Sequence, residues 1–159
     1  MHSLNLFHYP IYSQSLSDIT IAEGKKLIQT INAYSYIVAK KDAGFKHALQ
    51  NADILIPDGF PIVLAARLLQ KQTIQKIAGA DLFFYCMHQV ESMHGKVFFI
   101  GSTESTLAKI KERASKEFPN VEVGVYSPPY KPQFTKEDSE AMCNAINSFK
   151  PTVVFVGMT

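Results

Sequence analysis

One carboxylate in this chain stands where a strand-to-helix turn would present it to a ligand. The segment Ile54–Ile62 reads ILIPDGFPI, an apolar run followed by Asp58, Gly59 and a second apolar segment. The run predicts a buried strand ending at Pro57, and Pro61 suits the first turn of a helix, where its missing N–H would have no partner anyway. Asp58 would then lie at the carboxyl end of a strand, where open α/β sheets bind ligands. A purely structural role, starting the turn or capping the helix, explains the same pattern.

Other polar or small residues follow predicted strands or open predicted helices in the same way. They are Thr30, Asn32, Gly79, Asp81, Gly101 and Ser102. A structural interpretation also fits three of them, with Thr30 and Asn32 as polar ends of a buried strand and Asp81 as a helix cap. No Asp-x-Asp pair occurs in the sequence, so the carboxylate clamp that holds Mg²⁺ or Mn²⁺ in many nucleotide-sugar enzymes is missing. We therefore predict a site without a metal.

Several other chemistries have no signature here. The sequence contains no GxGxxG, no GxxxxGK[ST], no GxSxG and no HExxH, which argues against dinucleotide, P-loop, serine-hydrolase and zinc-protease sites. No cofactor is predicted. Cys86 and Cys143 form no CxxC pair, and we expect both to be reduced thiols in the core of a cytoplasmic protein.

Composition indicates an ordinary globular protein. The 159 residues suit one domain, residues 1–159, and the hydrophobic content of 47% against 19% charged residues argues against disorder. The formal charge of +2 is too small, and its cations too scattered, to predict nucleic acid as a partner. No apolar run approaches the roughly 18 residues of a spanning helix, and the start MHSL does not resemble a signal peptide. These features predict a cytoplasmic location.

Strand and helix patterns alternate along the chain. The predicted strands are residues 4–11, 27–32, 53–57, 96–101, 121–126 and 152–157, and the predicted helices are residues 33–50, 61–69, 79–94, 102–118 and 135–149. The run KVFFIG at residues 96–101 is typical of a strand buried on both faces. The alternation predicts an α/β fold with an open, mostly parallel, Rossmann-like sheet, helices on both faces, and no repeat or linker.

Three motifs together resemble those of a known family. They are Thr30-Ile31-Asn32, the segment ADILIPDG at residues 52–59, and the segment KIAGADL at residues 76–82. The apolar strands at residues 97–101 and 155–157 match two later strands of the same family. From about Leu27 to Thr159 the chain resembles the TagA/WecG/CpsF family of bacterial glycosyltransferases.

The resemblance implies a metal-independent, inverting transfer of an N-acetylhexosamine, with N-acetylmannosamine expected, from a UDP-sugar to a polyprenyl-diphosphate-linked sugar. Such reactions build wall teichoic acid and other cell-surface polysaccharides. Asp58 would be the base that deprotonates the acceptor hydroxyl, a step that typically contributes about 10²–10⁴-fold. The helices opening after Gly59 and Gly101 would offer positive potential to the leaving diphosphate. The implied substrate-binding residues are Thr30, Asn32, Gly59, Lys76, Gly79, Asp81, Gly101 and Ser102.

The sequence departs from the family pattern at three places. Lys76 stands where arginine is usual, which replaces a bidentate fork by a point charge, and Pro129-Tyr130 replaces a usual Gly-Tyr. The sequence stops at Thr159, where the family continues with a Pro-Lys-Gln-Glu motif and a C-terminal appendage that contacts the membrane. We therefore expect these 159 residues to be a core with an incomplete site. Peripheral contact with the inner face of the cell membrane is expected only through the absent part. We also expect the chain to associate with itself as a homo-oligomer through uncovered apolar surface.

A second interpretation belongs to another class of protein. A truncated relative could be a non-catalytic module that binds a nucleotide or a sugar nucleotide. The two interpretations differ in one measurable property, sugar transfer.

Overall fold

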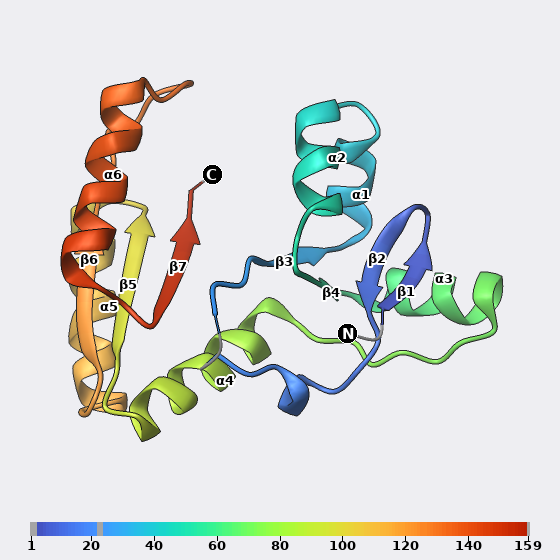
Figure 1. The fold of residues 1–159 in the computed structure, drawn as a ribbon, viewed down its shortest axis with the longest axis horizontal. Coiled ribbons are helices and arrows are strands. Elements are labelled where there is room, and N and C mark those ends of the chain that lie inside the picture. Colours follow the sequence, from blue (N-terminus) through green and yellow to red (C-terminus); the bar gives the residue numbers. More distant parts are fainter. Residues whose placement is uncertain (1–2, 22–23, 159) are drawn as a thin grey trace. The chain divides into compact units, whose positions relative to one another are not determined.

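The computed structural model describes residues 3–21 and 24–158, which form two compact units (Figure 1). The first unit extends to Phe84 and the second begins at Tyr85, so that the boundary falls within helix α4 (Gly79–Ser92). Each unit contains helices and one sheet in which parallel pairing dominates. The predicted Rossmann-like α/β fold class is confirmed, whereas a single domain for residues 1–159 stays a prediction.

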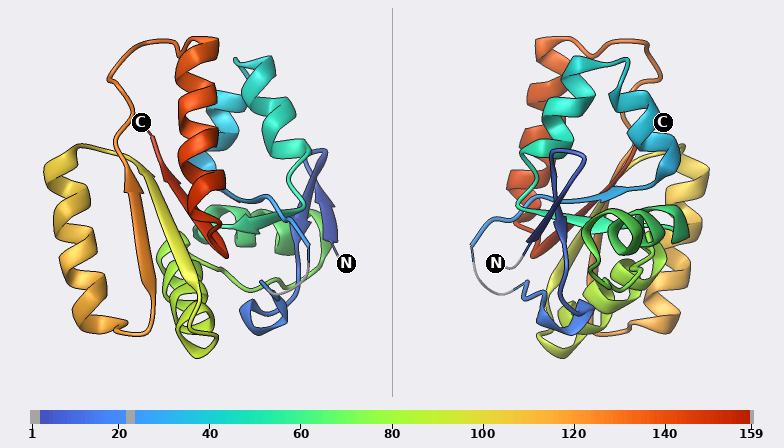
Figure 2. Two further views of the ribbon diagram at one scale, coloured as in Figure 1. Left: turned by 60° about the vertical axis from the view of Figure 1, so that its left-hand side comes forward. Right: turned by 90° about the vertical axis from the view of Figure 1, so that its right-hand side faces the viewer.

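The first unit builds its sheet in the strand order β1-β2-β4-β3, in which only the β1–β2 pair is antiparallel. Its elements before α4 are β1 (Ser3–Leu6), β2 (Tyr9–Tyr12), the 3₁₀ turn η1 (Leu16–Asp18), β3 (Ile28–Ile31), α1 (Ala33–Ala39), α2 (Ala43–Gln50), β4 (Ile54–Pro57) and α3 (Phe60–Gln70). Helices α1 and α2 lie side by side (Figure 2).

Strand β4 is the centre of the first unit. All four of its residues are buried. Leu55 belongs to one apolar cluster together with Leu49 of α2 and Ile62 of α3. Because successive side chains of a strand point to opposite faces, Ile54 and Ile56 are buried on the other face of the sheet. Burial on both faces explains why the sequence of this strand is a continuous apolar run.

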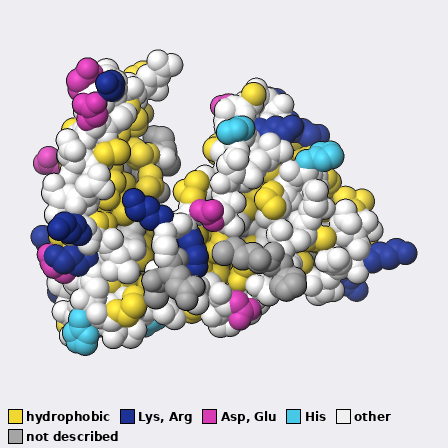
Figure 3. Space-filling view, in the orientation of Figure 1, with side chains coloured by type: hydrophobic (Ala, Val, Ile, Leu, Met, Phe, Trp, Pro, Cys, Tyr) yellow, Lys and Arg dark blue, Asp and Glu magenta, His cyan; other side chains and the backbone are white. Residues whose placement is uncertain are grey.

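The second unit holds a three-stranded, fully parallel sheet in the order β6-β5-β7. Its elements after α4 are β5 (Lys96–Gly101), α5 (Glu104–Glu117), β6 (Glu122–Tyr126), α6 (Lys136–Phe149) and β7 (Val153–Gly157). Helix α6 covers one face, where Met142 packs against Phe98 and Ile100, and α5 packs beside β6. The central strand β5 is buried from Val97 onward, as the sequence predicts. Figure 3 shows charged side chains of both signs along α5 and α6.

Two predicted elements are divided in the structure. The predicted strand of residues 4–11 is a hairpin, because Phe7 and His8 adopt φ values of 56° and 68° and reverse the chain between β1 and β2. The predicted helix of residues 33–50 consists of α1 and α2. It is interrupted because the Asp42 carboxylate accepts a hydrogen bond from the Phe45 N–H at 2.9 Å and starts a new helix.

The prediction of two core thiols is wrong for one cysteine. Cys86 is buried, and burial raises the pKa of its thiol to about 11. Cys143 is exposed on α6, where the neighbouring Met142 takes the inward position. Both cysteines are free of disulfides.

Candidate functional site

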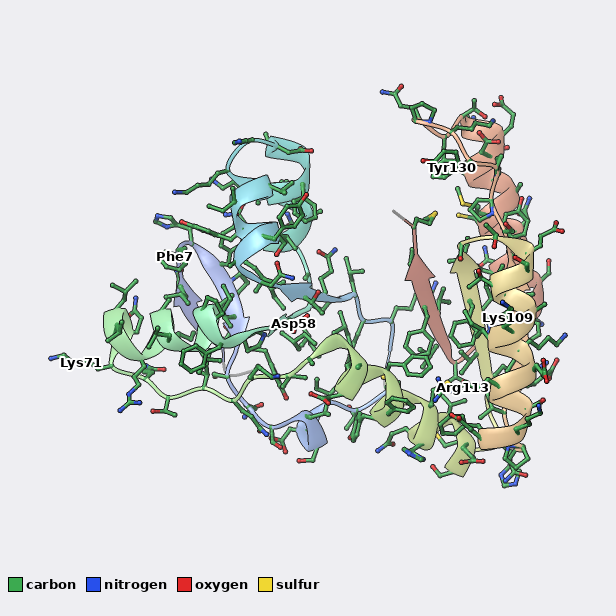
Figure 4. The ribbon with its side chains drawn as sticks, turned by 180° about the vertical axis from the view of Figure 1, so that it is seen from behind. Phe7, Asp58, Lys71, Lys109, Arg113 and Tyr130 are labelled. Atoms are coloured by element: carbon green, nitrogen blue, oxygen red, sulfur yellow. The ribbon has the colours of Figure 1, made fainter. Side chains whose placement is uncertain are left out.

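Strands β3 and β4 end side by side in the first unit. They run parallel, with Thr30 opposite Ile56 and Ile31 opposite Pro57. The Asp58 N–H donates a hydrogen bond to the Ile31 carbonyl at 2.9 Å, which continues this pairing past the end of β4. Asn32 and Asp58 are therefore the first residues beyond two adjacent strands, and Figure 4 shows Asp58 at this edge of the sheet.

Gly59 makes the turn that separates Asp58 from α3. Its φ of 108° with ψ of 150° is a conformation that residues with a Cβ rarely adopt. A Cβ built on it would lie 4.0 Å from the Cβ of Asn32, so the turn also passes close to the end of β3. No side chain of a described residue caps the N-terminus of α3, so the N–H groups of its first turn are open to a ligand, except at Pro61, which has none.

Asn32 is held in place by the start of α1. Its side-chain oxygen accepts a hydrogen bond from the Ser35 N–H at 2.8 Å, and its own N–H donates to the Ser35 hydroxyl at 2.8 Å. This reciprocal capping box fixes the side chain. Among the described residues the amide nitrogen of Asn32 has no partner, so its two N–H groups can donate to a substrate.

The chain returns to the same edge just before α4. The Ile77 N–H donates to the Pro57 carbonyl at 3.0 Å, which ties this segment to the end of β4. Further along it, a Cβ on Gly79 would lie 3.9 Å from the Thr30 methyl carbon. The structure thus brings Thr30, Gly79 and Gly59 to the edge that carries Asp58.

The remaining two predicted residues of this unit are placed differently. The Asp81 carboxylate accepts a hydrogen bond from the Ala78 N–H at 3.0 Å, so it caps the start of α4. The Lys76 side chain is exposed and forms no ion pair with another described residue. A substrate-binding role for either residue stays a prediction.

The Asp58 carboxylate itself is half-buried. Within residues 3–21 and 24–158 it has neither a hydrogen-bonding nor an ion-pair partner. Its oxygen atoms are therefore available to accept a proton, and the bond from the Asp58 N–H to the Ile31 carbonyl fixes the backbone from which the side chain extends. A general base needs such a free lone pair within reach of the substrate.

The second unit carries the other two predicted residues, Gly101 and Ser102, at the end of β5. Gly101 has a φ of 116°, and a Cβ there would overlap the carbonyl of Gly157 at the end of β7, so only glycine fits. Ser102 adopts a φ of 60°, and its carbonyl accepts a hydrogen bond from the Ser127 hydroxyl at 2.8 Å.

Helix α5 begins two residues later than predicted, at Glu104, where Thr103 caps it by accepting from the Thr106 N–H at 3.3 Å. Ser127, which follows β6, was not predicted from the sequence. The only signal is its place at the end of a strand, in a proline-rich loop.

The described part of the chain can also be searched for clusters of metal ligands and for membrane-spanning helices. It contains no group of three or more His, Cys, Asp or Glu side chains placed to hold a metal ion. None of its helices is both long enough and apolar enough to cross a membrane.

Comparison with known proteins identifies the family. Residues 5–159 match the family model described as "Glycosyl transferase WecG/TagA/CpsF family". This chain belongs to that family. The resemblance carried by the three motifs is thereby confirmed.

Curated relatives of this chain include proteins from Bacillus and Staphylococcus. An N-acetylglucosaminyldiphosphoundecaprenol N-acetyl-beta-D-mannosaminyltransferase of Bacillus spizizenii is 29% identical over 131 residues, which cover 82% of this chain and 49% of the relative. Proteins of the same name from Bacillus subtilis and Staphylococcus aureus are 25% and 24% identical, over 83% and 82% of this chain and 50% of each relative. The chain spans about half the length of these relatives.

Proposed function

We propose that the protein is an inverting glycosyltransferase that moves an N-acetylhexosamine, N-acetylmannosamine first among them, from a UDP-sugar to a polyprenyl-diphosphate-linked sugar. The observation that carries the proposal is the half-buried Asp58 carboxylate, without a partner among the described residues, at the carboxyl ends of β3 and β4. The names of the relatives supply the sugar and the class of lipid-linked acceptor. The products would be precursors of teichoic acid or another cell-surface polysaccharide.

In the proposed reaction Asp58 acts on the acceptor. Its carboxylate takes the proton of the acceptor hydroxyl while that oxygen forms a bond to the anomeric carbon of the donor. The bond from this carbon to the diphosphate breaks, and UDP leaves with the electron pair. Attack from the face opposite the diphosphate inverts the configuration. The carboxylate oxygen needs to approach the hydroxyl to within roughly 2.6–3.2 Å.

The groups around Asp58 suit a substrate with many oxygen atoms. The Asn32 amide can donate to it, and the N-terminus of α3 offers open N–H groups and the positive end of a helix dipole. Thr30 and Gly79 complete the edge, the first with a hydroxyl and the second by allowing close approach. Lys76, Asp81, Gly101 and Ser102 are further proposed substrate-binding residues.

A transfer assay tests this function. A chain extended to the length of the relatives is mixed with UDP-N-acetylmannosamine and an N-acetylglucosamine acceptor linked through diphosphate to a short lipid. We expect the disaccharide product with inverted anomeric configuration, and we expect its rate to persist in excess EDTA because the sequence has no Asp-x-Asp pair. A strict need for Mg²⁺ or Mn²⁺ would contradict metal independence. Binding of UDP without any transfer would favour the non-catalytic binding module.

A further inference from the structure

Two exposed aromatic side chains follow the polar residues at the ends of β3 and β4. Tyr34 lies two residues after Asn32 and is 79% exposed, and Phe60 lies two residues after Asp58 and is 67% exposed. The β3–β4 pair is parallel, with the last residues of the two strands opposite each other. Tyr34 and Phe60 therefore occupy equivalent positions beyond the sheet. We call these two residues the edge aromatics.

Neither of the edge aromatics belongs to the core of the first unit. Helices α1 and α3 both pack on one apolar cluster, through Ala39 and Ile62. The partly buried Tyr36 packs against this cluster, and its ring centre lies 4.9 Å from that of Phe7. The edge aromatics make no ring contact with another described residue. Their rings are thus open to a ligand, and aromatic side chains beside a few polar groups are typical of ligand sites.

The edge aromatics are close to the proposed base. Neighbouring strands of a sheet lie about 4.8 Å apart, and two residues span at most about 7 Å of backbone. The turn before Phe60 stays close to β3, because a Cβ on Gly59 would lie 4.0 Å from the Cβ of Asn32. Both rings can therefore reach a sugar whose hydroxyl contacts the Asp58 carboxylate.

We propose that the edge aromatics bind the acceptor sugar by stacking on the C–H face of its pyranose ring. A pyranose carries C–H groups on its faces and hydroxyl groups around its rim. Aromatic rings offer an apolar surface to the face, while the Asn32 amide and the Asp58 carboxylate can bond to the rim. This inference rests on the proposed function, because the role of Asp58 as the base places the acceptor beside the rings.

The chemistry of the two substrates favours the acceptor sugar over the donor. In a UDP-sugar the ribose and the diphosphate separate the uracil from the anomeric carbon, so the uracil lies away from Asp58. The donor sugar meets the acceptor hydroxyl only through its anomeric carbon. The acceptor sugar is the substrate ring that touches Asp58 directly, and it is therefore the ring nearest to Tyr34 and Phe60.

Acceptor kinetics in the chain extended to the length of the relatives test the proposal. Tyr34→Leu and Phe60→Leu keep an apolar side chain and remove the ring. We expect each variant to raise the KM for the diphosphate-linked N-acetylglucosamine acceptor by about tenfold. The KM for the UDP-sugar and the affinity for UDP should stay unchanged. Circular dichroism establishes that each variant is folded.

Two kinds of control separate stacking from a general loss of apolar surface. Tyr34→Phe and Phe60→Tyr keep a ring and should retain the KM of the parent chain for the acceptor. Leu68, at the other end of α3, is 69% exposed and lies two turns beyond Phe60. We expect Leu68→Ala to leave all three constants unchanged.

Calorimetry with the acceptor alone measures the same contact without any transfer. We expect its affinity to fall by about tenfold in the two leucine variants and to be retained in Tyr34→Phe and Phe60→Tyr. Acceptor binding that depends on the rings, in a chain that transfers no sugar, would contradict the proposed function alone.

Two results would overturn this inference. One is sugar transfer with an unchanged acceptor KM in both leucine variants, which would leave the proposed function standing. The other is a raised KM for the UDP-sugar in place of the acceptor, which would assign the edge aromatics to the donor.

Discussion

At Gly59 the backbone dictates the residue type. Its φ of 108° lies where a side chain strains the backbone, so we expect Gly59→Ala to lower the free energy of unfolding by about 1–2 kcal/mol. Urea unfolding measures the change. Gly79→Ala is the matched control. Gly79 starts a helix without a positive φ, and the atom nearest to an added Cβ would be the Thr30 methyl carbon at 3.9 Å. If Gly59→Ala were as stable as the parent chain, a side chain at residue 59 would not strain the backbone, and the prediction would be wrong.

Most of the edge around Asp58 could be predicted residue by residue. Thr30, Asn32 and Asp58 end or follow two apolar runs, and parallel strands bring such ends together. The bond from the Ile77 N–H to the Pro57 carbonyl could not be predicted, because the segment before it is irregular and its sequence has no periodicity. The uncapped N-terminus of α3 could not be predicted either, because it depends on the backbone conformation of Gly59, which the sequence motif does not specify.

At the scale of elements, the N-terminus of α6 predicts an acid-sensitive contribution to stability. A hydrogen bond from Lys131 and another from the Thr135 N–H lower the pKa of Asp138. Because this pKa is lower in the folded chain than in the unfolded chain, ionised Asp138 stabilises the fold above its unfolded pKa of about 3.9. This contribution is lost as the pH falls through the folded value.

Thermal unfolding of Asp138→Asn against pH measures that effect. We expect the variant to melt below the parent chain at pH 7 and the two melting temperatures to converge once the pH has fallen below the folded-state pKa of Asp138. A constant difference across this range would contradict an ionic origin.

Elements were predicted well where burial determines the sequence and poorly where a turn does. The predicted ends of β4, β5 and β7 agree with the observed ends to within one residue, because strands buried in a parallel sheet are continuously apolar. The hairpin turn at Phe7 and His8 contains no glycine, so the sequence lacks the usual signal of a tight turn. The break between α1 and α2 depends on the Asp42 cap, a signal that helical periodicity on both sides conceals.

At the scale of the whole molecule, the length of the relatives defines a comparison. The chain spans about half of each relative, and its two units each have buried strands and covering helices. We therefore expect the 159 residues to fold cooperatively and to bind UDP, but more weakly than a chain extended to the relatives' length, and to transfer sugar more slowly. Calorimetry with UDP and the transfer assay measure both quantities. Equal transfer rates would show that the described residues suffice.

The central claim is that Asp58 is the base for sugar transfer. The direct measurement is the turnover number of Asp58→Asn in the extended chain, beside its affinity for UDP and a Glu91→Gln control on α4. We predict that kcat falls by about 10²–10⁴-fold while folding and UDP affinity stay unchanged, because the amide keeps the shape of the carboxylate and cannot accept the proton. A folded Asp58→Asn variant that transfers sugar at a near-normal rate would contradict the account.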